Sequence, residues 1–172
     1  MCYNDIGDNM RTLLISINAK YIHTNNAVRL LKANCSFDVD IFEYTIKDSI
    51  TDIIKDIESY NPDVIGFSAY IWNITLITDI IDELSLDGSK IVLGGPEVSY
   101  ESMHFMQNHP IDYVVKGEGE IAFNMLLDTL KHNRDISVVP NLTYRIDGKL
   151  YSNPITEIID LDKLILPYYF EE

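Results

Sequence analysis

Five short apolar runs, each followed by a stretch with helical spacing of apolar residues, constrain the fold of this chain more than any other feature. Short apolar or alternating runs are typical of strands, and apolar residues three or four positions apart are typical of a helix. Because each helix can carry the chain back to the start of the next strand, these repeats predict a parallel sheet with helices on both faces. The predicted strands are 12–17, 37–44, 64–68, 90–93 and 113–116, and the predicted helices are 25–33, 50–60, 74–84, 100–108 and 121–132.

The chain changes character beyond Pro140. Two short apolar stretches there flank Asp147-Gly148, a dipeptide that is typical of a hairpin turn. We therefore predict an α/β fold, namely a Rossmann-like (flavodoxin-like), doubly wound, five-stranded parallel sheet of order 2-1-3-4-5 with a small C-terminal β-hairpin appendage. Residues 1–10 are expected to be a disordered leader, 11–139 the α/β domain, and 140–172 the hairpin and a linker.

The net charge of −14 limits the partners of this chain. An excess of carboxylates repels phosphate backbones and anionic lipids, which argues against nucleic acid and membrane as partners. No apolar run approaches the roughly 20 residues that span a bilayer, and the first residues lack the basic start of a signal peptide. Cys2 and Cys35 form neither a CxxC motif nor a disulfide framework, so a reducing, cytoplasmic location is expected.

Two acidic glycine loops follow predicted strands directly. The first is Gly94-Gly95-Pro96-Glu97, and the second is Gly117-Glu118-Gly119-Glu120. Ligands of open α/β sheets bind beyond the carboxyl ends of the strands, where glycine lets the backbone approach them closely. The loops therefore predict a binding site, although glycines that serve only a tight turn are an open alternative.

The composition of two loops argues against the binding of a dinucleotide or of FMN. Residues 117–122 match the GxGxxA form of a dinucleotide fingerprint. However, Glu118 and Glu120 would place two carboxylates beside a pyrophosphate, and no further strand–helix–strand unit follows. FMN binding is rejected because loop 20–26, after the first predicted strand, contains no glycine to cradle a phosphate.

Aromatic residues are concentrated in the loop after the third predicted strand. Tyr70 and Trp72 would lie at the carboxyl edge of the sheet, where half-exposed rings suit a broad, flat, largely apolar ligand. Packing of these rings against the hairpin is an equal alternative. In the first such loop, His23 is a candidate metal ligand or simply a hydrogen-bonding residue at the entry to a helix, for which Thr24 or Asn25 is the candidate N-cap.

Three strand-end motifs occur in an order that resembles a known family. The chain resembles the N-terminal cobalamin (B12)-binding domain of B12-dependent radical SAM proteins. The motifs that carry the resemblance are Gly66-Phe67-Ser68-Ala69-Tyr70, the loop 94–97 and the segment 116–120. The resemblance covers most of the chain. Even residues 140–149 and 160–162 resemble the stretch that leads into the radical SAM barrel in that family.

The resemblance implies a domain that holds the corrin ring at the carboxyl ends of the strands and the nucleotide tail of cobalamin in the crevice of the sheet. It places Ser68 and Tyr70 near the tail. Of the family's cobalt-ligating motif DxHxxG, only His23 is present, because Tyr21 and Asn26 replace the aspartate and the glycine. The implied cofactor-binding residues are Ser68, Tyr70, Gly94, Gly95, Glu97, Gly117, Glu118 and Gly119.

The same resemblance implies that catalysis belongs elsewhere. The family's barrel carries a CxxxCxxC motif for the 4Fe–4S cluster that cleaves S-adenosylmethionine, and this sequence has no such motif. The resemblance thus implies a cobalamin-binding domain that is not catalytic alone. Its partner would be the radical SAM barrel of the full-length protein, an enzyme of methyltransferase or cyclase type. The competing hypothesis is a degenerate domain that only docks or caps the barrel, with Trp72, Tyr168 and Tyr169 at the interface.

Overall fold

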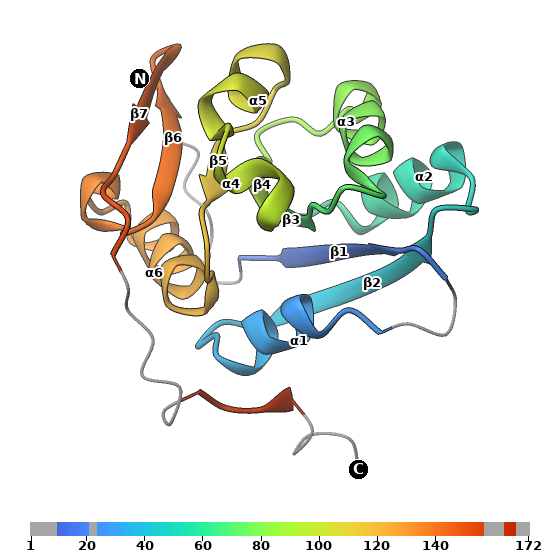
Figure 1. Cartoon of the computed structure of the whole chain (residues 1–172), viewed down its shortest axis with the longest axis horizontal. Coiled ribbons are helices and arrows are strands. Elements are labelled where there is room, and N and C mark those ends of the chain that lie inside the picture. Colours follow the sequence, from blue (N-terminus) through green and yellow to red (C-terminus); the bar gives the residue numbers. More distant parts are fainter. Residues whose placement is uncertain (1–9, 21–23, 157–163, 168–172) are drawn as a thin grey trace.

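The computed structural model describes residues 10–20, 24–156 and 164–167. Strands and helices alternate along the chain as far as α6, except that two helices, α4 and α5, lie between β4 and β5, and a hairpin follows (Figure 1). The strands are β1 Thr12–Asn18, β2 Val39–Thr45, β3 Val64–Ser68, β4 Lys90–Gly94, β5 Tyr113–Val115, β6 Leu142–Ile146 and β7 Lys149–Ser152. The helices are α1 Asn26–Ala33, α2 Ile50–Tyr60, α3 Ile74–Glu83, α4 Pro96–Ser99, α5 Ser102–Asn108, α6 Glu120–Lys131 and the 3-10 helix Ile136–Val138.

The strands form one sheet of order β2-β1-β3-β4-β5-β6-β7. The first five pair in parallel, which confirms the predicted order 2-1-3-4-5. The predicted hairpin also forms, and it continues the same sheet, because β6 pairs antiparallel with β5 (Tyr113 opposite Tyr144) and β7 with β6. The order reverses between β1 and β3, and at such a switch point the crevice outside the carboxyl ends of the strands is open to a ligand.

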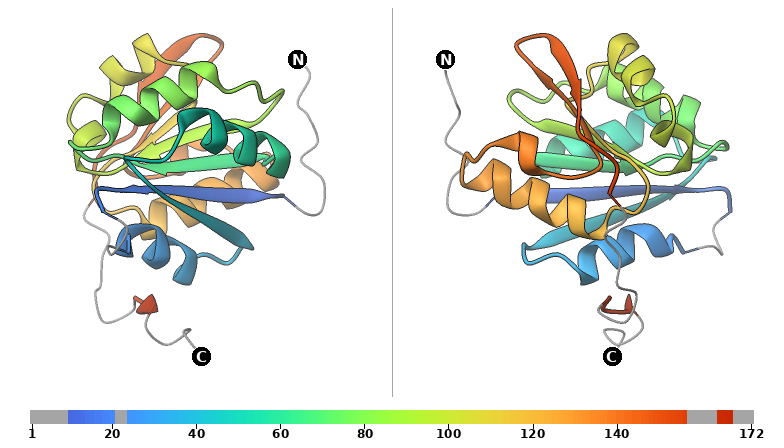
Figure 2. Two further views of the ribbon diagram at one scale, coloured as in Figure 1. Left: turned by 90° about the vertical axis from the view of Figure 1, so that its right-hand side faces the viewer. Right: turned by 60° about the vertical axis from the view of Figure 1, so that its left-hand side comes forward.

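Helices cover both faces of the sheet (Figure 2). Leu13, Ile15 and Ile17 of β1 pack with α2, α3 and α5 on one face, whereas Leu14 packs with α1 and α6 on the other. This alternation follows from the period of two along a strand. Apolar residues on both sides of β1 explain why its sequence is a nearly continuous apolar run.

The ends of several helices follow from single residues. The side chain of Asn25 accepts a hydrogen bond from the backbone N–H of Ala27 and caps α1, as one of the two predicted candidates. Helix α2 ends at Asn61, which has a left-handed backbone (φ 53°) and precedes Pro62. The sequence did not predict α4, whose four residues after Gly95 are too few to show a helical period.

No helix in the described ranges is both long and apolar enough to cross a membrane. Apart from Met10, whose side chain is buried, the expected leader lies outside the described residues.

Candidate functional site

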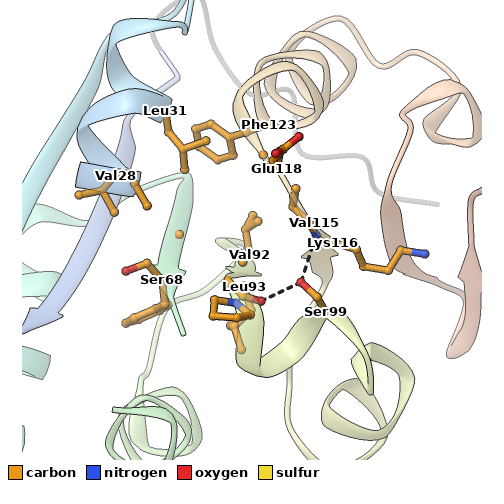
Figure 3. A pocket seen from close by; sticks show the side chains of 18 of the residues that line it. Val28, Leu31, Ser68, Val92, Leu93, Ser99, Val115, Lys116, Glu118 and Phe123 are labelled. Carbon is orange, nitrogen blue, oxygen red and sulfur yellow. Dashed lines mark hydrogen bonds between the residues drawn. The ribbon is translucent and has the colours of Figure 1, made fainter. Parts of the chain in front are cut away.

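A cavity of about 530 Å³ lies beside the carboxyl ends of β3, β4 and β5, on the face of the sheet that carries α1 and α6 (Figure 3). Val28 and Leu31 of α1 line one wall, and Phe123 of α6 lines another. Its size is within the usual range of about 300–1,000 Å³ for small-molecule sites. Most of the walls are apolar, so a ligand there gains free energy by leaving water. The sequence-predicted residues that line this cavity are Ser68, Tyr70, Gly94, Gly95, Gly117, Glu118 and Gly119.

Two glycines line the floor of the cavity. Gly66 and Gly94 lie on the same face of the sheet as Val92, which also lines the cavity. A Cβ on Gly94 would approach only the carbonyl oxygen of Val115, at 3.7 Å, so a longer side chain would extend into the cavity. A Cβ on Gly66 would lie 2.6 Å from Cδ2 of Leu14. Gly66 thus leaves room for the side chain of Leu14, whereas the missing side chain of Gly94 leaves open space in the cavity.

Gly95 is glycine for a different reason. Its φ is +113°, and a Cβ there would lie 2.3 Å from the carbonyl oxygen of Ala69. The neighbouring backbone is held close, since the N–H of Ala69 donates to the carbonyl of Gly94 at 2.7 Å. The fold itself therefore requires glycine at position 95. At position 94 the fold would accept a side chain, but that side chain would fill part of the cavity.

Ser99, which the sequence analysis did not single out, connects the two glycine loops. Its hydroxyl donates to the carbonyl of Gly95 at 2.8 Å and accepts from the N–H of Gly117 at 3.1 Å (Figure 3). Gly117 has a left-handed backbone (φ +66°), and a Cβ on Gly119 would lie 3.2 Å from Cδ2 of Leu31. These contacts place the second loop against α4 and the start of α6 against α1.

Ser68 brings a polar group to the cavity. It is buried, and its hydroxyl oxygen accepts a hydrogen bond from the Asn25 side chain at 2.6 Å. Since a serine hydroxyl is both donor and acceptor, Ser68 can also donate its hydroxyl proton to a ligand. The Asn73 amide donates to the carbonyls of Ser68 and Ile17, and its oxygen accepts from the N–H of Tyr70. This network fixes the end of β3 and the loop after it.

Tyr70 and Trp72 stack on each other beside a second cavity. Their ring centroids are 4.5 Å apart and their planes differ by 7°. Burial raises the pKa of Tyr70, while the side chain of Trp72 remains 49% exposed. Both rings border a hollow of about 430 Å³ that Asn18 and Asn25 also line. Tyr70 and Trp72 therefore stack on each other and not on a ring of the hairpin, whose Tyr151 stacks on Tyr144 of the same hairpin. A flat apolar surface therefore borders the mouth of the site.

The charged residues of the two glycine loops have different surroundings. Glu118 is exposed at the edge of the cavity, whereas Oε2 of Glu120 is buried and has no hydrogen-bond partner among the described residues. Glu97 lies on α4 and does not line either cavity. The Lys116 side chain extends away from the cavity (Figure 3) and donates to Ser152 Oγ at 2.6 Å and to the carbonyl of Asn153 at 3.1 Å. Burial lowers the pKa of Lys116.

The predicted metal ligand His23 lies in 21–23, outside the described residues, as do Tyr168 and Tyr169. Within the described ranges, no group of three or more His, Cys, Asp or Glu side chains is placed to hold a metal ion.

The sequence of this chain matches a known protein family. A family model for the B12 binding domain matches residues 12–127. The chain is 30% identical over 138 residues to an uncharacterised methyltransferase of Pyrococcus horikoshii, which covers 77% of this chain and 30% of that protein. It is 35% identical over 89 residues to the cobalamin-dependent radical SAM methyltransferase TokK of Streptomyces tokunonensis, which covers 49% of this chain and 13% of that protein. The chain thus spans less than a third of either relative.

Solved structures share the fold. The cobalamin-dependent S-adenosylmethionine radical enzyme OxsB, with aqua-cobalamin and S-adenosylmethionine bound, superposes with a TM-score of 0.70 at 21% identity, over 86% of this chain and 23% of that one. The radical S-adenosylmethionine methyltransferase TsrM of Kitasatospora setae, with cobalamin and a [4Fe-4S] cluster bound, gives a TM-score of 0.66 at 20% identity, over 91% of this chain and 31% of that one.

Proposed function

Since this chain belongs to the family of B12-binding domains, we propose that it binds cobalamin, with the nucleotide tail in the 530 Å³ cavity and the corrin ring across the carboxyl edge of the sheet. The observation that carries the proposal is the cavity between α1 and α6, whose floor is open where Gly94 has no side chain. The tail of cobalamin, a benzimidazole on a ribose phosphate, is long enough to need such a cavity.

The residues present fit this cofactor in both shape and chemistry. The apolar walls, which include Val28, Leu31 and Phe123, suit the benzimidazole ring. The hydroxyl of Ser68 gives the tail a donor. Oε2 of Glu120, which has no partner among the described residues, is an acceptor for a ribose hydroxyl of the tail and not for its phosphate. A buried carboxylate oxygen without a partner costs free energy, and a ligand that donates a hydrogen bond removes that cost.

In this proposal the predicted residues that line the cavity have binding roles, whereas Glu97, which lines neither cavity, has none. Ser68 and Tyr70 lie beside the tail, Gly94 forms the floor, and the loop 117–119 closes the cavity where α6 begins. The stacked Tyr70–Trp72 pair supplies a flat surface for the edge of the corrin. When bound, cobalamin supplies a cobalt ion that can carry a methyl group. The residues of this chain bind and orient the cobalamin. His23 is a candidate cobalt ligand on the evidence of the sequence.

The chemistry of the whole protein is a separate proposal. Because the cobalamin-dependent relatives are radical SAM enzymes and are much longer than this chain, we propose that it works beside a radical SAM barrel of its own protein. That barrel would hold the 4Fe–4S cluster and S-adenosylmethionine. In that arrangement, residues 11–139 form the cobalamin domain and 140–172 lead toward the barrel.

One observation favours the competing function, a domain that only docks the barrel. Apolar side chains are exposed near the carboxyl edge at Ile71, Trp72 and Tyr100, the last being 94% exposed. Such a group of apolar residues is typical of a protein interface as well as of a ligand surface. The two functions separate when the chain is mixed with hydroxocobalamin and desalted. Retention of the corrin visible spectrum supports cofactor binding, and colourless protein at high concentration supports docking alone.

A further inference from the structure

We infer that the segment after the hairpin, residues 153–156, forms a wall of the tail cavity and that Asn141 is the residue that positions it. The inference deepens the proposed function, because it extends the cobalamin-binding unit from residue 139 to residue 156 and adds Ile155 as a contact of the nucleotide tail. The family match ends at residue 127, so neither residue belongs to the part of the chain that defines the family.

Ile155 is the first observation. Its side chain lines the cavity together with residues of β3, β4, α1 and α6, although it comes from the far end of the described chain. It is 69% exposed, so the folded domain gains little from burying it. An exposed isoleucine at the edge of an otherwise apolar cavity becomes buried when a ligand fills that cavity, and this burial favours the bound state.

Asn141 holds the backbone beside Ile155. Its side-chain oxygen accepts from the N–H of Thr156 at 2.7 Å, and its amide donates to the carbonyl of Thr156 at 3.2 Å. The backbone N–H of Asn141 also donates to the carbonyl of Pro154 at 3.1 Å. Ile155 is therefore held between two anchored neighbours. Asn141 is buried and has a left-handed backbone (φ 59°), a conformation that asparagine tolerates better than most residues.

The same segment is tied to the second glycine loop. The backbone N–H of Lys116, just before Gly117, donates to the carbonyl of Asn141 at 2.8 Å. In return, the Lys116 side chain donates to Ser152 and to the carbonyl of Asn153. The Asn153 amide in turn donates to the carbonyls of Ile136 and Val139. The segment and Lys116, which directly precedes the loop 117–119, thus form one hydrogen-bonded unit on this side of the cavity.

Two variants of the full chain test the inference with two probes. Ile155→Ala removes the exposed apolar contact, and Asn141→Gly removes both side-chain bonds to Thr156 while it keeps a left-handed backbone accessible. Ile146→Ala is the matched control, because Ile146 is an exposed isoleucine of the same hairpin that does not line the cavity. The probes are hydroxocobalamin and cobinamide, which is the corrin without the nucleotide tail. Dissociation constants are measured for both, together with the thermal midpoint of each apo variant.

We expect Ile155→Ala and Asn141→Gly to weaken hydroxocobalamin on the order of fivefold while cobinamide affinity stays within about twofold. Ile146→Ala should change neither. Unchanged hydroxocobalamin affinity in Ile155→Ala overturns the inference, and so does an equal loss for both probes, which would place Ile155 beside the corrin instead. An equal loss in Asn141→Gly alone would reduce that residue to a structural role. If the unaltered chain binds neither probe, the proposed function itself fails.

Discussion

The hydroxyl of Ser99 accepts a hydrogen bond at 3.1 Å from the backbone N–H of Gly117, a residue 18 positions further along the chain. Because the same hydroxyl donates to the carbonyl of Gly95, its donor and acceptor roles are both used by backbone groups. The two glycine loops therefore form a single structural unit at the edge of the cavity.

Ser99→Ala should loosen this unit. The change leaves the Gly117 N–H and the Gly95 carbonyl without their partner, and it should cost about 1 kcal/mol of unfolding free energy. Cobalamin affinity should fall as well, because the second loop is then less well positioned. Denaturant unfolding and equilibrium binding measure the two effects. Ser137→Ala is the control, since Ser137 lies on an exposed 3-10 helix away from the cavity. Unchanged stability and affinity in Ser99→Ala would contradict the structural role.

The adjacent glycines of the first loop should respond in opposite ways. Gly94→Leu adds a side chain that extends into the cavity, so the domain should fold while cobalamin affinity falls at least about tenfold. Gly95→Ala instead meets the backbone of Ala69 in a strained conformation and should destabilise the fold by more than about 1 kcal/mol. Thermal unfolding with and without hydroxocobalamin distinguishes the two. Loss of the fold in Gly94→Leu, or full stability in Gly95→Ala, would contradict this assignment.

Much of the fold follows directly from the sequence, and the reason is the strength of the hydrophobic pattern. Both faces of β1 are buried, so its residues are nearly all apolar and the strand was easy to predict. The parallel order and the hairpin are confirmed, and so is the family resemblance, on motifs that lie at three strand ends. Pairing of the hairpin onto β5 was not predicted, because strand partners far apart in sequence leave no local pattern.

The cavity could be predicted only in part. The glycine loops were visible as motifs, but Gly94 and Gly95 look alike in sequence, and only the position of Ala69 separates their roles. The apolar wall residues Leu31 and Phe123 were indistinguishable from ordinary core residues of amphipathic helices. Ser99 was missed for a related reason, because a single serine on a four-residue helix carries no motif and its partners come from two separate loops.

Trp72 should contribute to the corrin and not to the tail. Trp72→Ala removes a half-exposed ring that stacks on Tyr70, so apo stability should fall by no more than about 1 kcal/mol. Affinity for hydroxocobalamin and for cobinamide should fall together, because both carry the same macrocycle. Absorbance titration measures both, since the variant lacks the single tryptophan. Ile71→Ala is the neighbouring exposed control. A loss confined to hydroxocobalamin would assign Trp72 to the tail instead.

His23→Ala should leave the spectrum of the bound cofactor nearly unchanged. The residues at the flanking motif positions are Tyr21 and Asn26 in place of aspartate and glycine, so the partners that usually accompany a ligating histidine are absent from the sequence. The visible bands of bound hydroxocobalamin report the cobalt ligands directly. A clear shift of these bands in the variant would identify His23 as a ligand.

The most direct test of the central claim compares the affinities of the full chain for hydroxocobalamin and for cobinamide. If the cavity between α1 and α6 holds the nucleotide tail, hydroxocobalamin should bind at least about tenfold more tightly, because cobinamide leaves that cavity unfilled. Fluorescence of Trp72, the single tryptophan, gives both dissociation constants in one titration format. Equal affinities for the two corrins, or no binding of either, would contradict the claim that this domain is built around the tail of cobalamin.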